Sequence, residues 1–500
     1  MTPETTGVPP WQARAARLLS ELGALRQAVA AEGDDRFRAW APSVVRAPFR
    51  TSAHNLACYL ALRHRDLRPL QAALRAYGLS SLGRLESRVL THLDATLGAL
   101  SAIAGAPVPA GAFVEPATYL AGEHRLEASS DELFGPTQRP RRVRLMVTLP
   151  SHAATEPDLL EGCLRAGADV VRINCAHDGP AAWTAMLEHL SRAEAKTGQS
   201  CRVLMDLAGP KPRIEAVLTA PGLGRIRTGD VLLLVRRQFR PLADWPAQLQ
   251  TSLGDALEPV AAGAEIWFDD GKLATVVERP DGEDLVLRVT EAGANGYRMK
   301  PEKGVNLPGT RLALAPLTAK DQADLAFACA HADMIGYSFV QTGRDVALLQ
   351  AELARHRPDD WQRLGLVAKI ETALAVKNLP EIIVQAAGAQ PFAVMIARGD
   401  LAVEIGFDRL AEMQEELLWL CEAAQVPVIW ATQVLERLVK KGLPSRGEMT
   451  DAAMAGRAEC VMLNKGPHLE RALRILDHLL VRMAEHQQKK TSLLRQLHAW

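Results

Sequence analysis

Eight short apolar runs recur between residues 143 and 464, and stretches with the spacing of amphipathic helices separate most of them. A continuous apolar run is typical of a strand buried on both faces, and strands that alternate with helices form parallel sheets. Eight such units predict an α/β fold, a (β/α)8 TIM barrel. The runs are VRLMVTL, DVVRIN, RVLMDL, DMIGYSF, LGLVAKI, FAVMIAR, VPVIWAT and ECVMLN.

One interval is too long for an ordinary barrel connection. About 100 residues separate the third run from the helix expected near residue 318, whereas most connections are a few residues long. Segments within it alternate in β fashion and are separated by turn residues. We therefore predict a small β-barrel lid domain, residues 214–303, inserted after the third strand. The segments are GDVLLLV, EIWFDDG, LATVVERP and EDLVLRVTEAG.

The two ends of the chain have a helical pattern. In residues 1–140, Leu and Ala recur at helical spacing with arginines on the other face, which predicts a mostly helical N-terminal extension. The catalytic barrel then comprises residues 141–213 and 304–490. Its last element is a predicted helix, HLERALRILDHLLVRMAEHQQKK, over residues 468–490.

Composition limits the class of protein. The 58 basic and 58 acidic residues balance, so we expect no nucleic-acid partner and no anionic-membrane partner. No apolar stretch reaches the roughly 18 residues of a membrane span, and the N-terminus lacks the pattern of a secretory signal. The seven cysteines are scattered without a CxxC pair, which predicts reduced thiols in a cytoplasmic protein.

Polar side chains end seven of the eight predicted strands. All strands of a parallel barrel end at the same face, where catalytic groups lie. One charged strand end is as often a route out of the core as a functional group, but mixed acids and bases at seven ends indicate a site. These residues are Arg172, Asn174, Asp206, Ser338, Lys369, Glu371, Asp400, Thr432, Asn464 and Lys465.

The most specific chemistry lies in Lys369, Glu371 and Asp400. The two carboxylates are hard oxygen ligands suited to Mg²⁺ or Mn²⁺. Lys369 is a point charge that could stabilise a phosphoryl group or an enolate oxygen. Backbone N–H groups of residues 397–400 could bind a carboxylate, because Gly399 permits close approach. This pattern predicts a divalent-metal site for a substrate with phosphate and carboxylate oxygens.

Three further side chains suit such a substrate. Arg172 and Arg213 offer planar guanidinium groups that match phosphate geometry. Thr432 is a candidate proton relay or carboxylate donor, although a threonine at a strand end is usually structural.

Residues 143–485 resemble the pyruvate kinase family, and the order and spacing of the matching runs agree with that family, as does the β insertion. The resemblance implies transfer of the phosphoryl group of phosphoenolpyruvate to ADP, giving pyruvate and ATP. The insertion would then be a lid that excludes water. The matching runs are VRINCAHDG, MDLAGPKPRI, IWFDDGKL, EKGVNLPGT, SFVQTGRDV, VAKIETALAV, VMIARGDLAVEIG and VIWATQVLERLVKKGLPSRGEMTDAAMAG.

The resemblance also implies a role for each matching residue. Glu371 and Asp400 would hold Mg²⁺ or Mn²⁺, and Lys369 would stabilise the phosphoryl group and the enolate. Thr432 and the backbone around Gly399 would bind the substrate carboxylate. The remaining implied residues are Arg398 beside Gly399 and Asp400, Arg172, Asn174, Arg213 and Lys303 at the phosphates, His177 near the nucleotide, and Asp270 from the lid.

Lys211 departs from the potassium-dependent members of the family, which have Gly-Pro-Glu where this chain has Gly209, Pro210 and Lys211. In the family, this lysine accompanies independence from K⁺, since a fixed ammonium can replace the charge of the monovalent cation. Ala176 and Leu207 stand in place of the usual serine and threonine ligands. We expect activity without added K⁺.

Two loops and the C-terminal part also depart from the family. The loop at 148–152 is shorter than the family's nucleotide loop, and residues 462–468 replace Ser-Gly-Glu-Thr-Ala-Lys-Gly, with Lys465 as a candidate for the lost lysine. We expect no counterpart of the family's C-terminal regulatory domain after the last predicted helix. We therefore expect that any homo-oligomer differs from the standard regulatory tetramer.

These departures leave two other functions open. The altered loops would suit another metal-dependent enolate reaction, by a 2-oxo acid lyase or aldolase, or by a kinase with a different acceptor. A non-catalytic regulatory barrel would predict loss of the metal ligands, yet Glu371 and Asp400 are present. Phosphoryl transfer to ADP ranks first, because the carboxylates, lysine, threonine and phosphate arginines all remain.

Overall fold

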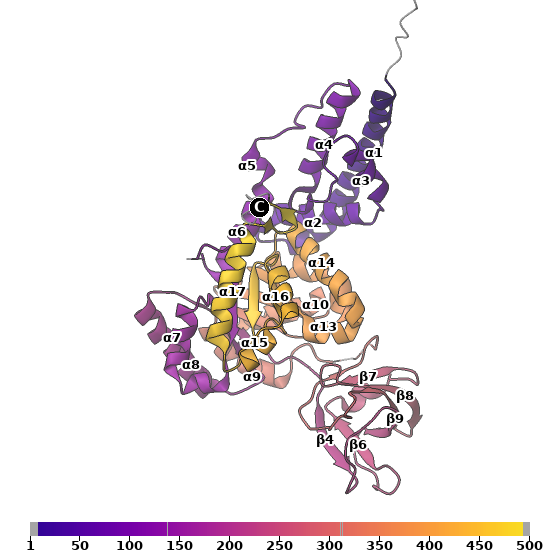
Figure 1. The fold of residues 1–500 in the computed structure, drawn as a ribbon, viewed down its shortest axis with the longest axis vertical. Coiled ribbons are helices and arrows are strands. Elements are labelled where there is room, and N and C mark those ends of the chain that lie inside the picture. Colours follow the sequence, from indigo (N-terminus) through magenta and orange to yellow (C-terminus); the bar gives the residue numbers. More distant parts are fainter. Residues whose placement is uncertain (1–8, 138, 311, 313, 494–500) are drawn as a thin grey trace, which may run out of the picture.

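The computed structural model describes residues 9–137, 139–310, 312 and 314–493. A helical part, a barrel and a β domain follow one another along the long axis of the molecule (Figure 1). The last described residues of the chain lie between the helical part and the barrel.

The barrel is closed and entirely parallel, in the order β1-β15-β14-β13-β12-β11-β3-β2. This confirms the predicted (β/α)8 fold, and each strand coincides with one of the apolar runs. The strands are β1 (Arg144–Thr148), β2 (Val170–Asn174), β3 (Arg202–Asp206), β11 (Met334–Tyr337), β12 (Gly365–Ile370), β13 (Phe392–Ala397), β14 (Val428–Ala431) and β15 (Cys460–Leu463).

Helices surround the barrel, and three of them begin with reciprocal capping boxes, formed by Thr318, Thr342 and Ser445 with an acidic residue three positions later. The helices are α7 (Pro157–Arg165), α8 (Pro180–Thr197), α9 (Ala319–His331), α10 (Gly343–His356), α11 (Ala373–Lys377), α12 (Leu379–Ala387), α13 (Arg398–Ile405), α14 (Phe407–Ala423), α15 (Glu436–Lys441), α16 (Arg446–Ala455) and α17 (Leu469–Ala484).

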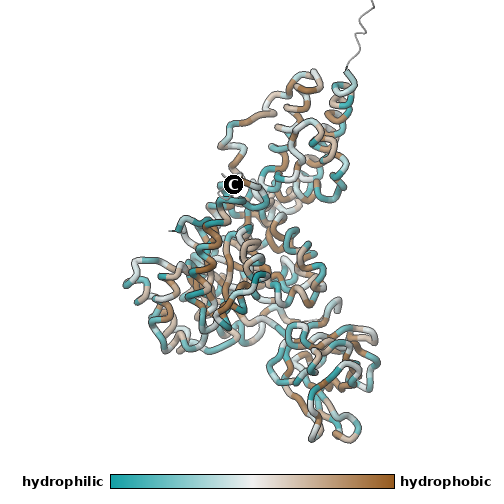
Figure 2. Tube along the Cα trace, in the orientation of Figure 1, coloured by the Kyte–Doolittle hydropathy of each residue, from teal (hydrophilic) through white to brown (hydrophobic). Residues whose placement is uncertain are grey.

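The inserted β domain has its own core, and Figure 2 shows hydrophobic segments running through both this domain and the barrel. Its strands form one sheet in the order β10-β7-β8-β9-β5-β6-β4. An antiparallel bridge between Arg213 and Gly304 brings the two ends of the sheet together, as expected of a small β barrel. The strands are β4 (Ile214–Thr219), β5 (Val231–Val235), β6 (Ala247–Thr251), β7 (Glu265–Phe268), β8 (Leu273–Asp281), β9 (Asp284–Ala292) and β10 (Val305–Asn306).

The helical part covers the end of the barrel where the strands begin. Leu133 and Phe134 join the interior side chains of the barrel in one apolar cluster. Asn55 Nδ2 donates to the carbonyl of Ala423, 2.8 Å away, just before β14. The helical part therefore leaves the end where the strands finish uncovered. The helices are α1 (Pro10–Trp40), α2 (Arg50–Arg63), α3 (Arg68–Arg75), α4 (Val89–Ala104), α5 (Pro116–Tyr119) and α6 (Ala121–Phe134).

The C-terminal segment differs from its prediction. The helix predicted over residues 468–490 ends at Ala484, and β16 (Gln487–Gln488) and β17 (Thr491–Ser492) form a short hairpin instead. No helix in the described ranges has the length and apolarity needed to cross a membrane. All seven cysteines are described, buried and free of disulfide bonds.

Candidate active site

Lys369 is the centre of a buried polar cluster at the carboxyl end of the barrel strands. Its ammonium group donates to Ser338 Oγ, 2.7 Å away, and lies 3.2 Å from Glu371 Oε1 and 3.4 Å from Asp206 Oδ2. The side chains of Lys369, Glu371 and Asp206 are 12%, 3% and 1% exposed. Three strand ends, those of β3, β11 and β12, therefore place an ammonium group between two carboxylates.

The charges in this cluster hold one another ionised. Burial alone would lower the pKa of Lys369, but the carboxylates of Asp206 and Glu371 outweigh it and raise that pKa. Burial would also raise the pKa of Asp206, but Lys369 and Arg172 bring it below its ordinary value. The cluster therefore presents a fixed cation to the mouth of the barrel at neutral pH.

Arg172 reaches Asp206 from the neighbouring strand β2. Its Nε and Nη2 donate to Asp206 Oδ2 at 2.8 and 2.5 Å, and its Nη1 donates to Thr148 Oγ1 at 3.1 Å. Gly336 in β11 provides the space, because a Cβ at this position would lie 2.5 Å from Asp206 Oδ1. Asp206 thus orients both Arg172 and Lys369.

Glu371 is positioned by a strained backbone. The backbone N–H of Phe339 donates to Glu371 Oε2 at 2.6 Å, and Phe339 has a φ of 56°, in the left-handed region that bulky residues rarely adopt. Burial raises the pKa of Glu371, and the negative charge of Asp400 adds to this effect despite the opposing charge of Lys369. The positive charge of Lys369 therefore does not fully offset the cost of burying this carboxylate.

Asp400, in the first turn of α13, pairs with Lys211. The two groups lie 2.6 Å apart, and the same ammonium group lies 3.5 Å from Asp270 of the inserted domain. Burial alone would lower the pKa of Lys211, but Asp400 and Asp270 outweigh it and raise that pKa. Gly304 leaves room for the lysine, because a Cβ there would lie 2.7 Å from Lys211 Cε.

Thr432 and Gly399 face each other across the ends of β14 and β13. The backbone N–H of Gly399 donates to Thr432 Oγ1 at 2.9 Å, and Thr432 has a φ of 62°. The Arg398 guanidinium turns the other way: it pairs with Asp451 and donates to the carbonyls of Ala431 and Thr432 at 3.0 and 2.6 Å. Arg398 thus braces the loop with its side chain and leaves only backbone groups to face a ligand.

The other predicted residues lie around this mouth or in the inserted domain. The side-chain oxygen of Asn174 accepts from Ala176 N at 3.1 Å. His177 lies close by at the surface; partial desolvation of its ring and the positive charges of Lys465 and Arg213 lower its pKa. Arg213 donates to the carbonyl of Glu302 at 2.9 Å. Lys303 lies 3.0 Å from Asp269 Oδ1.

The donor set fits a hard divalent cation. Glu371 is a buried carboxylate whose pKa is raised, so an added positive charge would stabilise its ionised form. Asp400 already has a cation beside it, the ammonium group of Lys211. In the described part of the chain, no three His, Cys, Asp or Glu side chains form a complete cage. A metal ion would therefore be held by two carboxylates and by the substrate's own oxygens, which is usual for Mg²⁺.

Comparison with known proteins gives the family. The model of the family described as "Pyruvate kinase, barrel domain" matches residues 140–467. This chain belongs to the pyruvate kinase family. It is 34% identical over 328 residues to a pyruvate kinase of Agrobacterium vitis and 33% identical over 331 residues to one of Mycobacterium intracellulare.

The similarity covers part of each chain. Each of these two alignments covers 65% of this chain and 65% of the relative. A pyruvate kinase of Geobacillus stearothermophilus is 30% identical over 318 residues, which is 63% of this chain and 51% of the relative. Residues 1–139 and 468–500 lie outside the matched family model.

The sequence places Asp206 and Ser338 at strand ends, but it did not predict their contacts with Arg172 and Lys369. It also did not indicate the roles of the Phe339 N–H, Gly336 and Gly304. The two glycines could not be predicted from their side chains, because what they contribute is space. The pairing of Asp206 could have been predicted, because this acid ends β3, which lies next to the strand of Arg172 and is separated from β12 by one strand.

Proposed function

We propose that this chain transfers the phosphoryl group of phosphoenolpyruvate to ADP, giving pyruvate and ATP, with Mg²⁺ or Mn²⁺ and without K⁺. The observation that carries the proposal is the buried cluster in which the Lys369 ammonium lies 3.2 Å from Glu371 and Asp400 is near enough to raise the pKa of Glu371. Phosphoryl transfer consists mainly of positioning and charge neutralisation, and this cluster offers both.

Each residue has a defined task in this proposal. A divalent ion held by Glu371 and Asp400 would neutralise charge on the phosphoryl oxygens. Lys369 would face the transferred group and the enolate oxygen left behind, with its charge kept by Asp206 and Glu371. Thr432 Oγ1 and the N–H of Gly399 would bind the substrate carboxylate. The Arg172 guanidinium, which Asp206 fixes in place, would bind a phosphate group.

Lys211 supports the proposal of K⁺ independence. Its ammonium group supplies a positive charge beside Asp400 that is covalently part of the chain. It also contacts Asp270 of the inserted domain, which supports a lid that closes over the mouth and excludes water. The free, buried cysteines support a reducing compartment, the cytoplasm.

The test is a lactate-dehydrogenase-coupled assay with phosphoenolpyruvate, ADP and Mg²⁺ or Mn²⁺. We expect pyruvate formation that needs ADP and the metal. Lys369→Met should lower kcat by at least about 100-fold, as expected when a charge that stabilises the transition state is lost. Lys440→Met, on the exposed side chain that pairs with Glu436, is the matched control and should leave kcat unchanged. Pyruvate methyl-proton exchange without any phosphoryl transfer would favour a different enolate reaction.

A further inference from the structure

Ser80, in the loop between α3 and α4, lines a cavity at the opposite end of the barrel from the candidate active site. The cavity has a volume of about 880 Å³ and lies where the helical part, the start of the barrel and the C-terminal hairpin meet. Ser80 is exposed, and His92 and Tyr119 line the same cavity. All three residues precede residue 140, where the match to the family model begins. A function of these residues would therefore be separate from that of the barrel.

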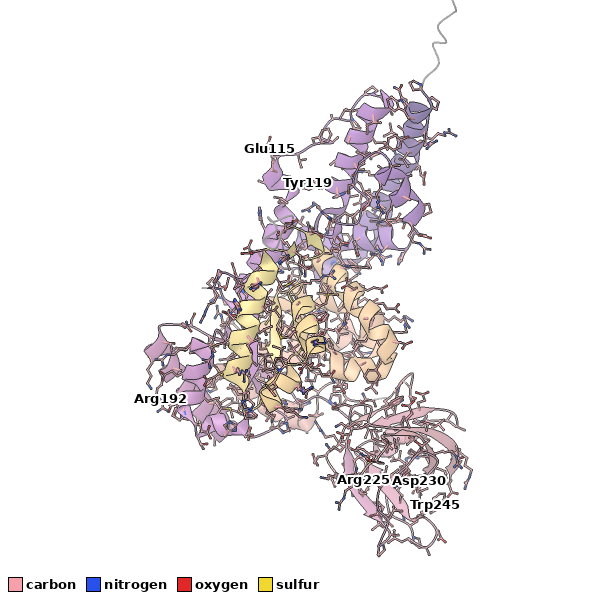
Figure 3. The ribbon with its side chains drawn as sticks, in the orientation of Figure 1. Glu115, Tyr119, Arg192, Arg225, Asp230 and Trp245 are labelled. Carbon is pink, nitrogen blue, oxygen red and sulfur yellow. The ribbon has the colours of Figure 1, made fainter. Side chains whose placement is uncertain are left out.

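The three side chains form a continuous series of hydrogen bonds. Ser80 Oγ lies 2.6 Å from Nε2 of His92, and the other ring nitrogen, Nδ1, lies 2.8 Å from the hydroxyl group of Tyr119. A serine hydroxyl bonded to an imidazole whose second nitrogen is held by a third group is the arrangement that activates a nucleophile. Tyr119, labelled in Figure 3, ends the short helix α5, and the Arg88 guanidinium lies over its ring, 4.5 Å from the ring centre. Tyr119 is thus fixed in a position from which it orients the imidazole.

The backbone of the loop favours transfer of the serine proton to the histidine. The N–H of Leu82 donates to Ser80 Oγ at 3.2 Å, so this oxygen already accepts one hydrogen bond, and its own proton is free to be donated to Nε2 of His92. The neutral imidazole then carries its proton on Nδ1 and donates it to Tyr119. Leu82 has a φ of 58°, in the left-handed region that bulky residues rarely adopt. Backbone strain of this kind is concentrated at functional sites.

His92 is able to accept a proton at neutral pH. It is 6% exposed, and burial lowers its pKa to about 4, with the positive charge of Arg88 adding to the effect. The imidazole is therefore uncharged at neutral pH, as a general base must be before it reacts. The same burial disfavours the imidazolium that forms during attack. We therefore expect slow turnover, and covalent modification of the serine is the most sensitive measure of its reactivity.

The same loop contains donors for an oxyanion. The backbone N–H groups of Ser81 and Gly83 have no hydrogen-bond acceptor among the residues that the structure describes. The N–H that directly follows the nucleophile is an oxyanion donor in many serine hydrolases. Such donors stabilise the negative charge that develops on the carbonyl oxygen during attack.

We propose that Ser80 is the nucleophile of a second active site, which cleaves carboxylic esters. The Ser80 proton passes to Nε2 of His92 while Oγ bonds to the acyl carbon. The bond from that carbon to the leaving oxygen then breaks, and His92 returns the proton to the departing alcohol. Water attacks the acyl-serine by the same route and releases the acid and the free serine. Esters suit a weak base better than amides, because an alcohol needs less help from an acid to leave than an amine does.

Labelling of the full chain with a fluorophosphonate, which bonds covalently to activated serines, tests the proposal. Peptide mass spectrometry should locate one probe molecule per chain, on Ser80. Ser80→Ala should abolish this labelling, and His92→Gln should slow it at least about 100-fold, as expected when a general base is lost. Thr491→Ala, which removes another hydroxyl group from the wall of the same cavity, is the matched control and should be labelled at the wild-type rate.

Tyr119→Phe tests the positioning role of the tyrosine. It should lower kcat for p-nitrophenyl acetate by about 10-fold with KM unchanged, because it affects the orientation of the base and not the binding of the ester. Circular dichroism and the melting temperature establish that each variant is folded. Labelling should be equal with Mg²⁺ and with EDTA, which separates it from metal-dependent phosphoryl transfer. An unlabelled Ser80 in the wild type, an unchanged rate in folded His92→Gln, or equally fast labelling of other serines would overturn the proposal.

Discussion

The ammonium nitrogen of Lys211 lies 2.6 Å from Oδ1 of Asp400, and the same nitrogen is 3.5 Å from Oδ1 of Asp270 in the inserted domain. One side chain thus joins α13, which carries the proposed metal ligand, to the inserted β domain. A fixed positive charge therefore lies where the inserted domain contacts the barrel.

Lys211→Glu replaces that ammonium group with a carboxylate. We expect the wild type to be equally active in KCl and in tetramethylammonium chloride of the same ionic strength. In the variant, kcat/KM should fall at least about tenfold in tetramethylammonium and recover in KCl, since K⁺ can then supply the missing charge. A wild-type rate that is negligible until K⁺ is added would contradict the assignment.

Thr432 is expected to act through its hydroxyl group, which accepts from the Gly399 N–H at 2.9 Å. Thr432→Val keeps the shape and removes the hydroxyl, so kcat/KM for phosphoenolpyruvate should fall about 10- to 100-fold. Thr432→Ser keeps the hydroxyl and should stay within about threefold of the wild type. Equal losses in both variants would mean that the packing of the whole side chain matters, and not the hydroxyl group by itself.

Gly336→Ala should damage the site without removing any polar group. The new Cβ would lie 2.5 Å from Asp206 Oδ1 and 3.0 Å from Asp206 Cα, so Asp206 must move and take Arg172 with it. We expect a loss of about 1–3 kcal/mol in the free energy of unfolding, together with lower kcat. Urea denaturation and the coupled assay measure these.

Gly23→Ala in α1 is the matched control, because a Cβ at Gly23 meets no atom within 4 Å. It should stabilise the protein by up to about 1 kcal/mol, since alanine is the better helix former. If Gly336→Ala is equally harmless, the close packing of β11 against Asp206 is not a constraint on the site.

Glu404 in α13 predicts a pH-dependent stability. Burial raises its pKa from 4.5 to about 7, with Asp400 adding to the effect and the hydrogen bond from Asn306 opposing it. The folded state therefore holds a proton that the unfolded state releases, so this contribution to stability is complete below about pH 4.5 and is lost as the pH rises to about 7. Glu404→Gln lacks that loss.

Relative to the wild type, Glu404→Gln should gain stability between pH 5 and pH 8, by up to about 3 kcal/mol. Urea unfolding of both proteins at the two pH values measures the difference. A difference that is the same at both pH values would show that Glu404 titrates in the folded state as it does in the unfolded chain.

The strands of the barrel could be predicted because most of their residues are buried on both faces and are apolar. The helices between the strands could also be predicted, from the spacing of their apolar residues. The hairpin at residues 487–492 could not be predicted, because each of its strands is only two residues long and its lysines pair with the distant acids Glu459 and Glu86.

The residues of the candidate site could be predicted, but the hydrogen bonds and ion pairs between them could not. Strand order places Arg172, Asp206 and Lys369 on one rim, yet which acid pairs with which base depends on the tilt of the strands and on the space beside Gly336. The side chain of Arg398 illustrates the difference: the sequence suggested a ligand contact, and its guanidinium lies against Asp451. Likewise, the helical pattern of the N-terminal part did not indicate which surface it would cover.

The most direct test of the whole account is Mn²⁺ binding, followed by electron paramagnetic resonance, in the wild type, Glu371→Gln, Asp400→Asn and the control Glu258→Gln on the exposed surface of the inserted domain. The account predicts one Mn²⁺ per chain in the wild type and in Glu258→Gln. Loss of either proposed ligand should weaken binding by at least about 100-fold, more than removal of an outer partner usually costs. Mn²⁺ binding of equal strength in all four proteins would contradict it.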